Sequence, residues 1–130
     1  MSKSEKRVQT LQDNIKQWSD DTFGNHRTGK PIAYHLKKEI DEVIDAIDIL
    51  RAAGNNKGLP WRERYGDIRK SQRRVKFELA DCLTLLLDIA SHEYINVSEL
   101  LDATEEKLEI NKKRKWGEPD ENGVVEHMPE

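Results

Sequence analysis

The sequence predicts an all-α protein built from four amphipathic helices. Apolar residues recur at spacings of three and four over most of the chain, which is the period of one helix face. Charged residues make up 36% of the sequence and aromatic residues only 6%, so the apolar supply suits narrow helical stripes better than the interior of a sandwich or barrel. A chain of 130 residues is long enough for one domain with a core, and too short for two.

Overall charge and hydropathy exclude several classes of partner. The formal net charge of -3 argues against a strong attraction of the whole chain to nucleic acid or to anionic membranes. No apolar stretch approaches the roughly 18 residues of a membrane span, and the N-terminus lacks the apolar core of a signal peptide. The one cysteine, Cys82, lies within an apolar run and is expected to be a reduced packing residue. We therefore expect a cytoplasmic protein without a membrane or a stable nucleic-acid partner.

The first predicted helix covers residues 4–18 and is followed by an ordered loop over residues 19–30, which are rich in turn formers. Trp18 and Phe23 flank the first half of this loop. Aromatic residues at such a place commonly close the end of a core. They can also form a wall on which a nucleobase stacks. The sequence leaves both interpretations open.

The second predicted helix begins at Pro31, which suits a first helical turn, and ends near Ala53 before Gly54. At about 100° per residue, Glu39 and Glu42 project from one shoulder of its apolar seam. The seam consists of Leu36, Ile40, Val43, Ile47 and Leu50. Three further acids, Asp41, Asp45 and Asp48, fall on the back of the helix, where exposure to solvent explains them.

Residues 55–74 lack a clear period and are interpreted as an insertion between helices. The segment is strongly basic. A solvated loop is the simpler account, and a positive rim for a polyphosphate or a partner subunit is the alternative. Its basic residues are Arg62, Arg64, Arg69, Lys70, Arg73 and Arg74.

The third predicted helix runs from Ser71 to Tyr94 and repeats the pattern of the second. A shift of 39 residues carries Glu39 onto Glu78 and Glu42 onto Asp81. The same shift superimposes the second seam, Val75, Leu79, Cys82, Leu86 and Ile89, on the first. If the two seams pack antiparallel, the two acid pairs can face a common point. Four carboxylates suit Mg²⁺ or Mn²⁺. A di-iron site is the competing interpretation, but neither Glu39 nor Glu78 has a histidine three residues later.

The fourth predicted helix starts after Asn96 and ends at Trp116. Lys107, Asn111 and Arg114 line one face near its end. Cations are favourable at any helix C-terminus, which is a sufficient explanation when this face is taken alone. Opposite a metal-binding acid cluster, the same face would complete a cleft for a polyphosphate.

These motifs together resemble the all-α NTP pyrophosphohydrolases of the MazG-like superfamily. Glu39-Ile-Asp-Glu42 and Glu78-Leu-Ala-Asp81 resemble its ExxE…ExxD signature, and residues 107–114 resemble its later K-x3-N-x2-R element. Thr22-Phe-Gly, His35-Leu-x-x-Glu39 and the run from Asn111 to His127 are similar to the branch described as dATP/dGTP diphosphohydrolase-like. The likeness extends over residues 18–127. One departure is the insertion at residues 55–74, which makes the gap between the two acid motifs longer than is usual.

The resemblance implies a four-helix bundle-like MazG-type fold and hydrolysis of a (deoxy)nucleoside triphosphate to monophosphate and pyrophosphate. A purine dNTP is the substrate that the similar branch suggests. By carry-over, Glu39, Glu42, Glu78 and Asp81 bind Mg²⁺, and one of the glutamates orients the attacking water. Lys107, Asn111 and Arg114 hold phosphates, while Trp18 or Phe23 contacts the base. His35 either supports the site or packs. Homodimers or homotetramers are expected, with a catalytic domain at residues 1–117 and a tail at residues 118–130 that closes over the site or a neighbouring subunit.

Two other functions remain open on the sequence. One is a dUTP/dCTP pyrophosphatase of the same superfamily, since nothing ranks the bases. The other is a non-catalytic helical module that binds nucleic acid through residues 62–76. Salt-sensitive binding would identify the second.

Overall fold

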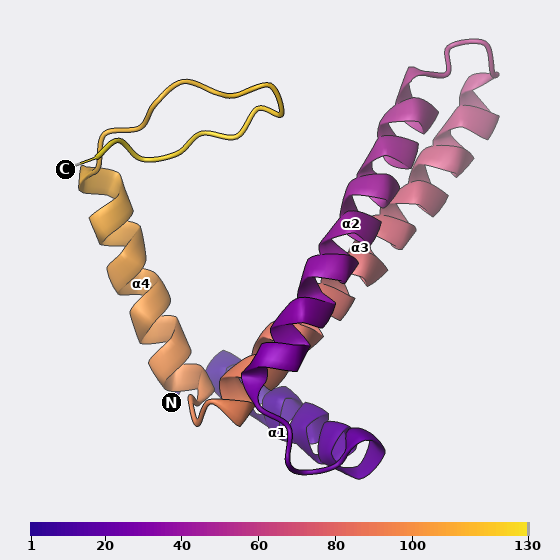
Figure 1. Cartoon of the computed structure of the whole chain (residues 1–130). Coiled ribbons are helices and arrows are strands. Elements are labelled where there is room, and N and C mark those ends of the chain that lie inside the picture. The colour runs from indigo at the N-terminus through magenta and orange to yellow at the C-terminus, as the bar shows by residue number, and fades with distance from the viewer. Residues whose placement is uncertain (130) are drawn as a thin grey trace. The chain divides into compact units, whose positions relative to one another are not determined.

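The computed structural model describes residues 1–129, which form four helices and no strand (Figure 1). The helices are α1 (Lys3–Phe23), α2 (Gly29–Asn55), α3 (Trp61–His92) and α4 (Val97–Lys113). This confirms the all-α prediction. The chain divides into two compact units, Met1–Val97 and the residues from Ser98 onward, which are described separately below. No helix in the described range has an apolar stretch long enough to cross a bilayer.

Helix α1 is longer than predicted. It is capped by Ser2, whose hydroxyl accepts from the Glu5 N–H at 3.1 Å, and it ends at Gly24, where φ is +92°. The predicted end at Trp18 was wrong, because residues 19–23 continue the helix. Side-chain bonds one turn apart support that last part: Lys16 donates to Asp20 at 2.6 Å, and Gln17 donates to Asp21 at 3.0 Å. The predicted loop over residues 19–30 is therefore reduced to residues 24–28.

The predicted insertion at residues 55–74 is mostly helix. Helix α3 begins at Trp61, ten residues before the predicted start, and only residues 56–60 connect it to α2. The half-buried residues in this part are Arg64, Ile68, Ser71 and Val75, at spacings of four, three and four. The helical period is thus present, but an arginine and a serine carry two of its four positions. For that reason a search for apolar residues missed it.

Helix α3 is the central element of the first unit. Helices α1 and α2 both pack against it, and Figure 1 shows α2 and α3 side by side as a hairpin. The start of α2 is fixed to the end of α3, because the Gly29 N–H donates to Glu93 Oε1 at 2.8 Å. A Cβ at Gly29 would lie 2.7 Å from that oxygen, so any larger residue there would displace the Glu93 side chain. The buried apolar core is small: Ile15, Ile32, Val43, Ala46, Cys82, Leu87, Ala90 and Val97.

Parts of the two predicted seams do not pack. Val43 and Cys82 are buried as expected, but four other seam residues are exposed by 37% to 52%: Ile40, Ile47, Leu79 and Leu86. A two-helix hairpin buries only the line along which its helices touch. The rest of each apolar arc stays open unless another element covers it. The seam prediction was therefore wrong for these four residues.

In the second unit, the chain after α4 folds back on itself. Trp116 and His127 form an antiparallel bridge, and their rings meet edge to face at 6.0 Å. The Trp116 indole N–H donates to the Asn111 carbonyl at 3.0 Å. At the tip, Asp120 Oδ1 accepts from two backbone N–H groups, and Gly123 adopts a φ of +78°. The sequence run from Asn111 to His127 thus encodes a folded loop; residue 130 of the predicted tail lies outside the described residues.

Candidate metal and nucleotide site

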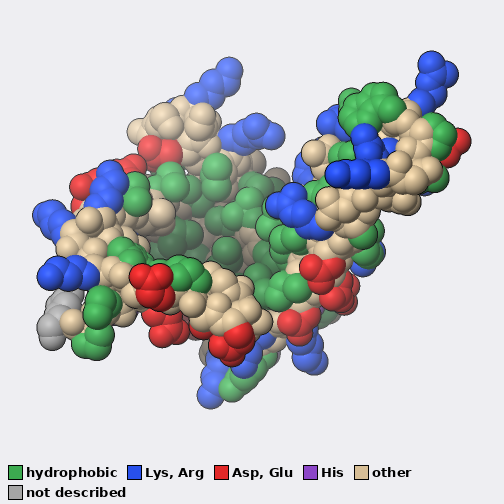
Figure 2. Space-filling model, turned by 90° about the horizontal axis from the view of Figure 1, so that it is seen from above, with side chains coloured by type: hydrophobic (Ala, Val, Ile, Leu, Met, Phe, Trp, Pro, Cys, Tyr) green, Lys and Arg blue, Asp and Glu red, His purple; other side chains and the backbone are tan. Residues whose placement is uncertain are grey.

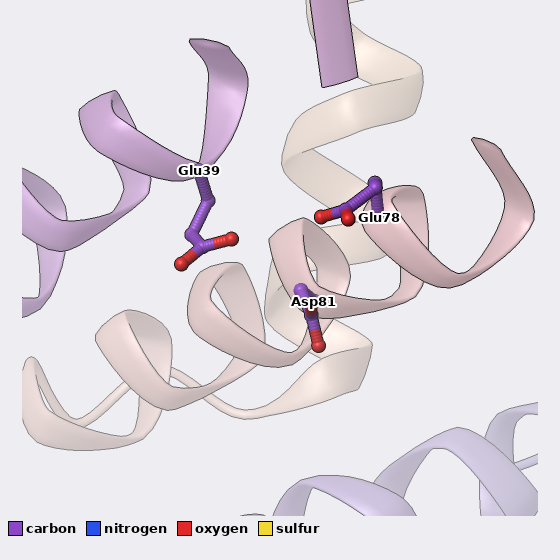
Figure 3. A group of neighbouring side chains, drawn as sticks. All are labelled: Glu39, Glu78 and Asp81. Carbon is purple, nitrogen blue, oxygen red and sulfur yellow. The ribbon is translucent and has the colours of Figure 1, made fainter. Parts of the chain in front are cut away.

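Three of the four predicted metal ligands meet between α2 and α3. One carboxylate oxygen from each of Glu39, Glu78 and Asp81 lies within 4.8 Å of the others. Figure 3 shows Glu39 reaching from α2 toward the two acids of α3. Glu39 and Glu78 are half-buried, and Asp81 is exposed. Three like charges so close repel one another unless a cation lies among them.

Glu42 is not part of this cluster and is exposed. The structure does not bring this residue to the point where the other three acids meet, and the antiparallel packing explains why. Glu39 lies opposite Glu78, so three residues further along α2 lead toward the hairpin tip, while three residues further along α3 lead toward its base. Each step is about 4.5 Å of helix rise, which separates Glu42 from Asp81 by about 9 Å along the axes.

His35 contacts one member of the cluster. Its Nε2 lies 3.1 Å from Glu39 Oε1, one helical turn away on α2. The side chain of His35 is 52% exposed, so the residue does not pack in the core. Of the two roles left open by the sequence, the contact favours supporting the site. His35 holds the Glu39 carboxylate in place and leaves its second oxygen available.

The predicted phosphate-binding residues lie in the second unit. Lys107 is exposed on α4, and Asn111 and Arg114 are half-buried near its end. The structure brings two of the three together, because Arg114 Nη1 donates to Asn111 Oδ1 at 3.2 Å. The Asn111 backbone carbonyl also accepts from Trp116. The C-terminal loop therefore fixes the amide and the guanidinium relative to each other.

The part of the chain that contains these residues is similar to a known protein family. Residues 67–130 match the model of the dATP/dGTP pyrophosphohydrolase family. This match agrees with the resemblance seen in the sequence motifs. The members of the family are nucleoside triphosphate pyrophosphohydrolases, which are enzymes. Comparisons with curated proteins and with solved structures give no match.

The family match includes Glu78, Asp81 and the predicted phosphate-binding residues, while Glu39 lies before it. The hairpin is what brings Glu39 to the matched acids. Both the family and the acid cluster point to a divalent metal.

The predicted base contacts also lie before the family match. Trp18 and Phe23 meet edge to face at the end of α1, with ring centroids 5.4 Å apart, and each is more than half exposed. The Arg27 guanidinium lies 4.7 Å from the centre of the Phe23 ring. The two rings therefore do not plug the core, and more than half of each side chain is accessible to a ligand.

Cys82 borders the acid cluster on its buried side. Burial raises the pKa of the Cys82 thiol, and the charges of Glu39, Asp81 and Glu78 raise it further. The residue is a free, buried thiol, as the sequence predicted. It packs under the site and stays protonated near neutral pH.

A second polar cluster, between α1 and α3, was missed by the sequence analysis. Asp88 is 3% exposed and accepts from the buried Ser19 hydroxyl at 2.8 Å. His92 Nδ1 lies 2.8 Å from the Asp88 carbonyl, and Nε2 lies 3.3 Å from Asp20 Oδ1. Arg27 donates to Ser19 at 3.2 Å. The only sequence signal is the spacing of four between Asp88 and His92 in an otherwise apolar region.

Proposed function

We propose that this protein is a cytoplasmic, Mg²⁺-dependent hydrolase that converts dATP or dGTP to the monophosphate and pyrophosphate. The observation that carries the proposal is the meeting of Glu39 with Glu78 and Asp81, because it gives a chain that matches this family an oxygen-only cluster of the correct kind. The family description supports the purine deoxynucleotides as substrates.

The donor set fits a hard cation. Mg²⁺ and Mn²⁺ prefer carboxylate and water oxygens, and the cluster offers only carboxylates. Ligand oxygens around an octahedral Mg²⁺ lie about 2.9 to 4.2 Å apart, so three oxygens within 4.8 Å of one another can bind one ion after movements of their side chains. We assign Glu39, Glu78 and Asp81 as direct ligands. Glu42 is assigned as an outer carboxylate that hydrogen-bonds a water of the ion, since Mg²⁺ keeps several waters.

The bound metal supplies polarisation of a phosphoryl group and a water of lowered pKa for attack on phosphorus. The chain's own residues do the rest. His35 orients Glu39, and one of the glutamates orients the attacking water. Lys107, Asn111 and Arg114 bind the phosphates, with the Arg114–Asn111 bond holding the guanidinium in place before substrate arrives. Trp18 and Phe23 offer aromatic surface to the base.

We further propose that the enzyme is a homodimer or homotetramer. The support comes from the apolar surface that the hairpin and α1 leave open, which a second copy of the chain would cover. Its residues on α2 and α3, each exposed by 37% to 52%, are Ile40, Ile44, Ile47, Leu79, Leu83 and Leu86.

The test is a substrate panel with identified products. Each dNTP is incubated with Mg²⁺ and purified protein, and release of pyrophosphate rather than phosphate is followed. We expect release from dATP or dGTP. Replacing a metal ligand should cost more than the 10- to 100-fold typical of outer-shell residues, so Glu78→Ala should lose roughly 100-fold or more. The matched control is Asp45→Ala, an exposed acid on the back of α2, which should retain full activity. Release of no pyrophosphate from any dNTP, or undiminished release by Glu78→Ala, contradicts the proposal.

A further inference from the structure

The first half of α3 carries a concentration of positive charge that the proposed reaction does not use. Between Trp61 and Lys76 the helix has seven cations and two acids, in a chain whose formal net charge is -3. Figure 2, in which the far end of the α2–α3 hairpin lies at the right, shows Lys and Arg side chains gathered there. The net charge of the whole chain therefore hides a local field of opposite sign.

Four of these cations form one stripe. At about 100° per residue, Arg62, Arg69, Arg73 and Lys76 fall within an arc of roughly 60° on one face of α3. The two acids, Glu63 and Asp67, lie more than about 100° away from its centre. From Arg62 to Lys76 the stripe is about 21 Å long. Such a length exceeds one triphosphate and suits a repeating anion.

The stripe has no internal counter-charge. Over residues 1–129, no acid lies within ion-pair distance of any of the four cations. Arg69 donates to the neutral Gln72 at 3.3 Å. Arg69, Arg73 and Lys76 border a surface depression of about 520 Å³, together with Lys70 and Gln72. An anion entering it would meet donors and no carboxylate.

Exposed aromatic rings flank the stripe. On one side, Trp61 and Tyr65 are 62% and 50% exposed, with centroids 5.7 Å apart. On the other side, Phe77 is 53% exposed, and the Arg73 guanidinium lies 4.6 Å from the centre of its ring. Cations and exposed aromatic rings are the two components by which proteins bind single-stranded nucleic acid.

We propose that this face of α3, formed by Trp61, Arg62, Tyr65, Arg69, Arg73 and Lys76, binds single-stranded DNA. The cations contact successive phosphates, and the rings stack on bases. The aromatic rings favour a single strand, because the bases of a duplex are not exposed for stacking. The face contacts phosphates and bases, and a DNA strand supplies both without the 2′-hydroxyl that marks RNA. The surface is distinct from the acid cluster, so this function is independent of the proposed hydrolysis.

The main experiment measures binding of a fluorescent 20-nucleotide single strand by anisotropy at several salt concentrations. The test variant combines Arg62→Gln, Arg69→Gln, Arg73→Gln and Lys76→Gln. The control variant removes the same charge elsewhere, through Lys3→Gln, Lys6→Gln, Arg7→Gln and Lys37→Gln. We expect the test variant to bind at least about 10-fold more weakly and to lower the slope of log K against log salt by about 3. The control should keep the wild-type slope, and both variants should keep pyrophosphate release.

A second variant separates stacking from charge. Trp61→Ala should weaken binding by about 5-fold or more without changing the salt slope. Tyr94→Ala, which removes an exposed aromatic residue just beyond the other end of α3, should change neither. Wild-type protein that fails to bind at low salt, or a test variant that binds as wild type, overturns the proposal. Tighter binding of duplex DNA or of RNA than of single-stranded DNA also overturns it. If the test variant differs from wild type only in the oligomer mass measured by sedimentation, the stripe is a contact between copies of the chain and the proposal is overturned.

Discussion

The two polar clusters of the first unit both place carboxylates between helices, but they differ in what neutralises them. Between α1 and α3, Asp88 and Asp20 lie against the Ser19 hydroxyl, the His92 ring and the Lys16 ammonium. Only Asp88 Oδ1 lacks a hydrogen bond there within the described residues, although His92 Nδ1 is 3.1 Å away. Between α2 and α3, Glu39, Glu78 and Asp81 have one another and a single histidine contact.

The difference separates a structural cluster from a functional one. A buried polar group whose partners lie in its own chain stabilises the fold and leaves nothing to bind a ligand. Clustered carboxylates without internal cations are destabilising until an external cation joins them. Substitutions in the α1–α3 cluster should therefore lower the stability of the fold, and substitutions in the α2–α3 cluster should lower activity and metal binding.

The largest stability effect is expected from Asp88→Ala. The substitution leaves Ser19 and His92 without their buried partner, so the free energy of unfolding should fall by about 3 kcal/mol. Urea unfolding measures it, and pyrophosphate release per folded molecule should stay near wild type. Asp45→Ala, at an exposed position, should change stability by no more than about 0.5 kcal/mol. If both variants are equally stable, the α1–α3 cluster is not structural.

A smaller effect, on activity alone, is expected from His35→Ala. Loss of the contact with Glu39 should slow pyrophosphate release about 10-fold and raise the Mg²⁺ concentration needed for half-maximal rate. Because the His35 side chain is 52% exposed, the unfolding curve should not move. If saturating Mg²⁺ restores none of the lost rate, His35 does not act by supporting the metal site.

The smallest expected effect is on the pH dependence of stability, and it arises at the C-terminal end of α1. The hydrogen bond from Lys16 lowers the pKa of the Asp20 carboxyl, with His92 adding to the shift, and Asp20 in turn raises the pKa of Lys16. A lowered folded-state pKa gives stability that is complete above the unfolded value of about 3.9 and is lost as pH falls through the folded value. Lys16→Gln should therefore be less stable than wild type at neutral pH, and the gap should close in acid. A gap that is unchanged below pH 3 would contradict this cause.

The sequence predicted the helices and most of the cluster because both depend on local period. Glu39, Glu78 and Asp81 follow from their phase relative to the seams. Glu42 lies outside the cluster because an antiparallel pairing that sets Glu39 opposite Glu78 moves Glu42 and Asp81 apart along the axes. A match of phase gives the face on which a residue lies and does not give its level along the paired helix.

The other departures from the prediction have a different physical origin. The first part of α3 packs against only one neighbour, so Arg64 and Ser71 suffice at positions where a deeper core would need apolar residues. The Ser19–Asp88–His92 cluster joins residues 69 positions apart, and no local pattern announces such a pairing. The exposure of Leu79 and Leu86 depends on which elements cover the hairpin, which a period does not specify.

The most direct test of the central account is metal binding without substrate. Thermal or urea unfolding of the wild-type protein is measured in chelator and then in increasing Mg²⁺, beside Asp81→Asn and the matched exposed control Asp45→Asn. The account predicts that wild type and Asp45→Asn gain about 2.7 kcal/mol when Mg²⁺ reaches 100 times its dissociation constant. Asp81→Asn should gain little, and in chelator it should be at least as stable as wild type because one repelling charge is gone. An equal gain in all three proteins would contradict the assignment of the Glu39–Glu78–Asp81 cluster as the metal site.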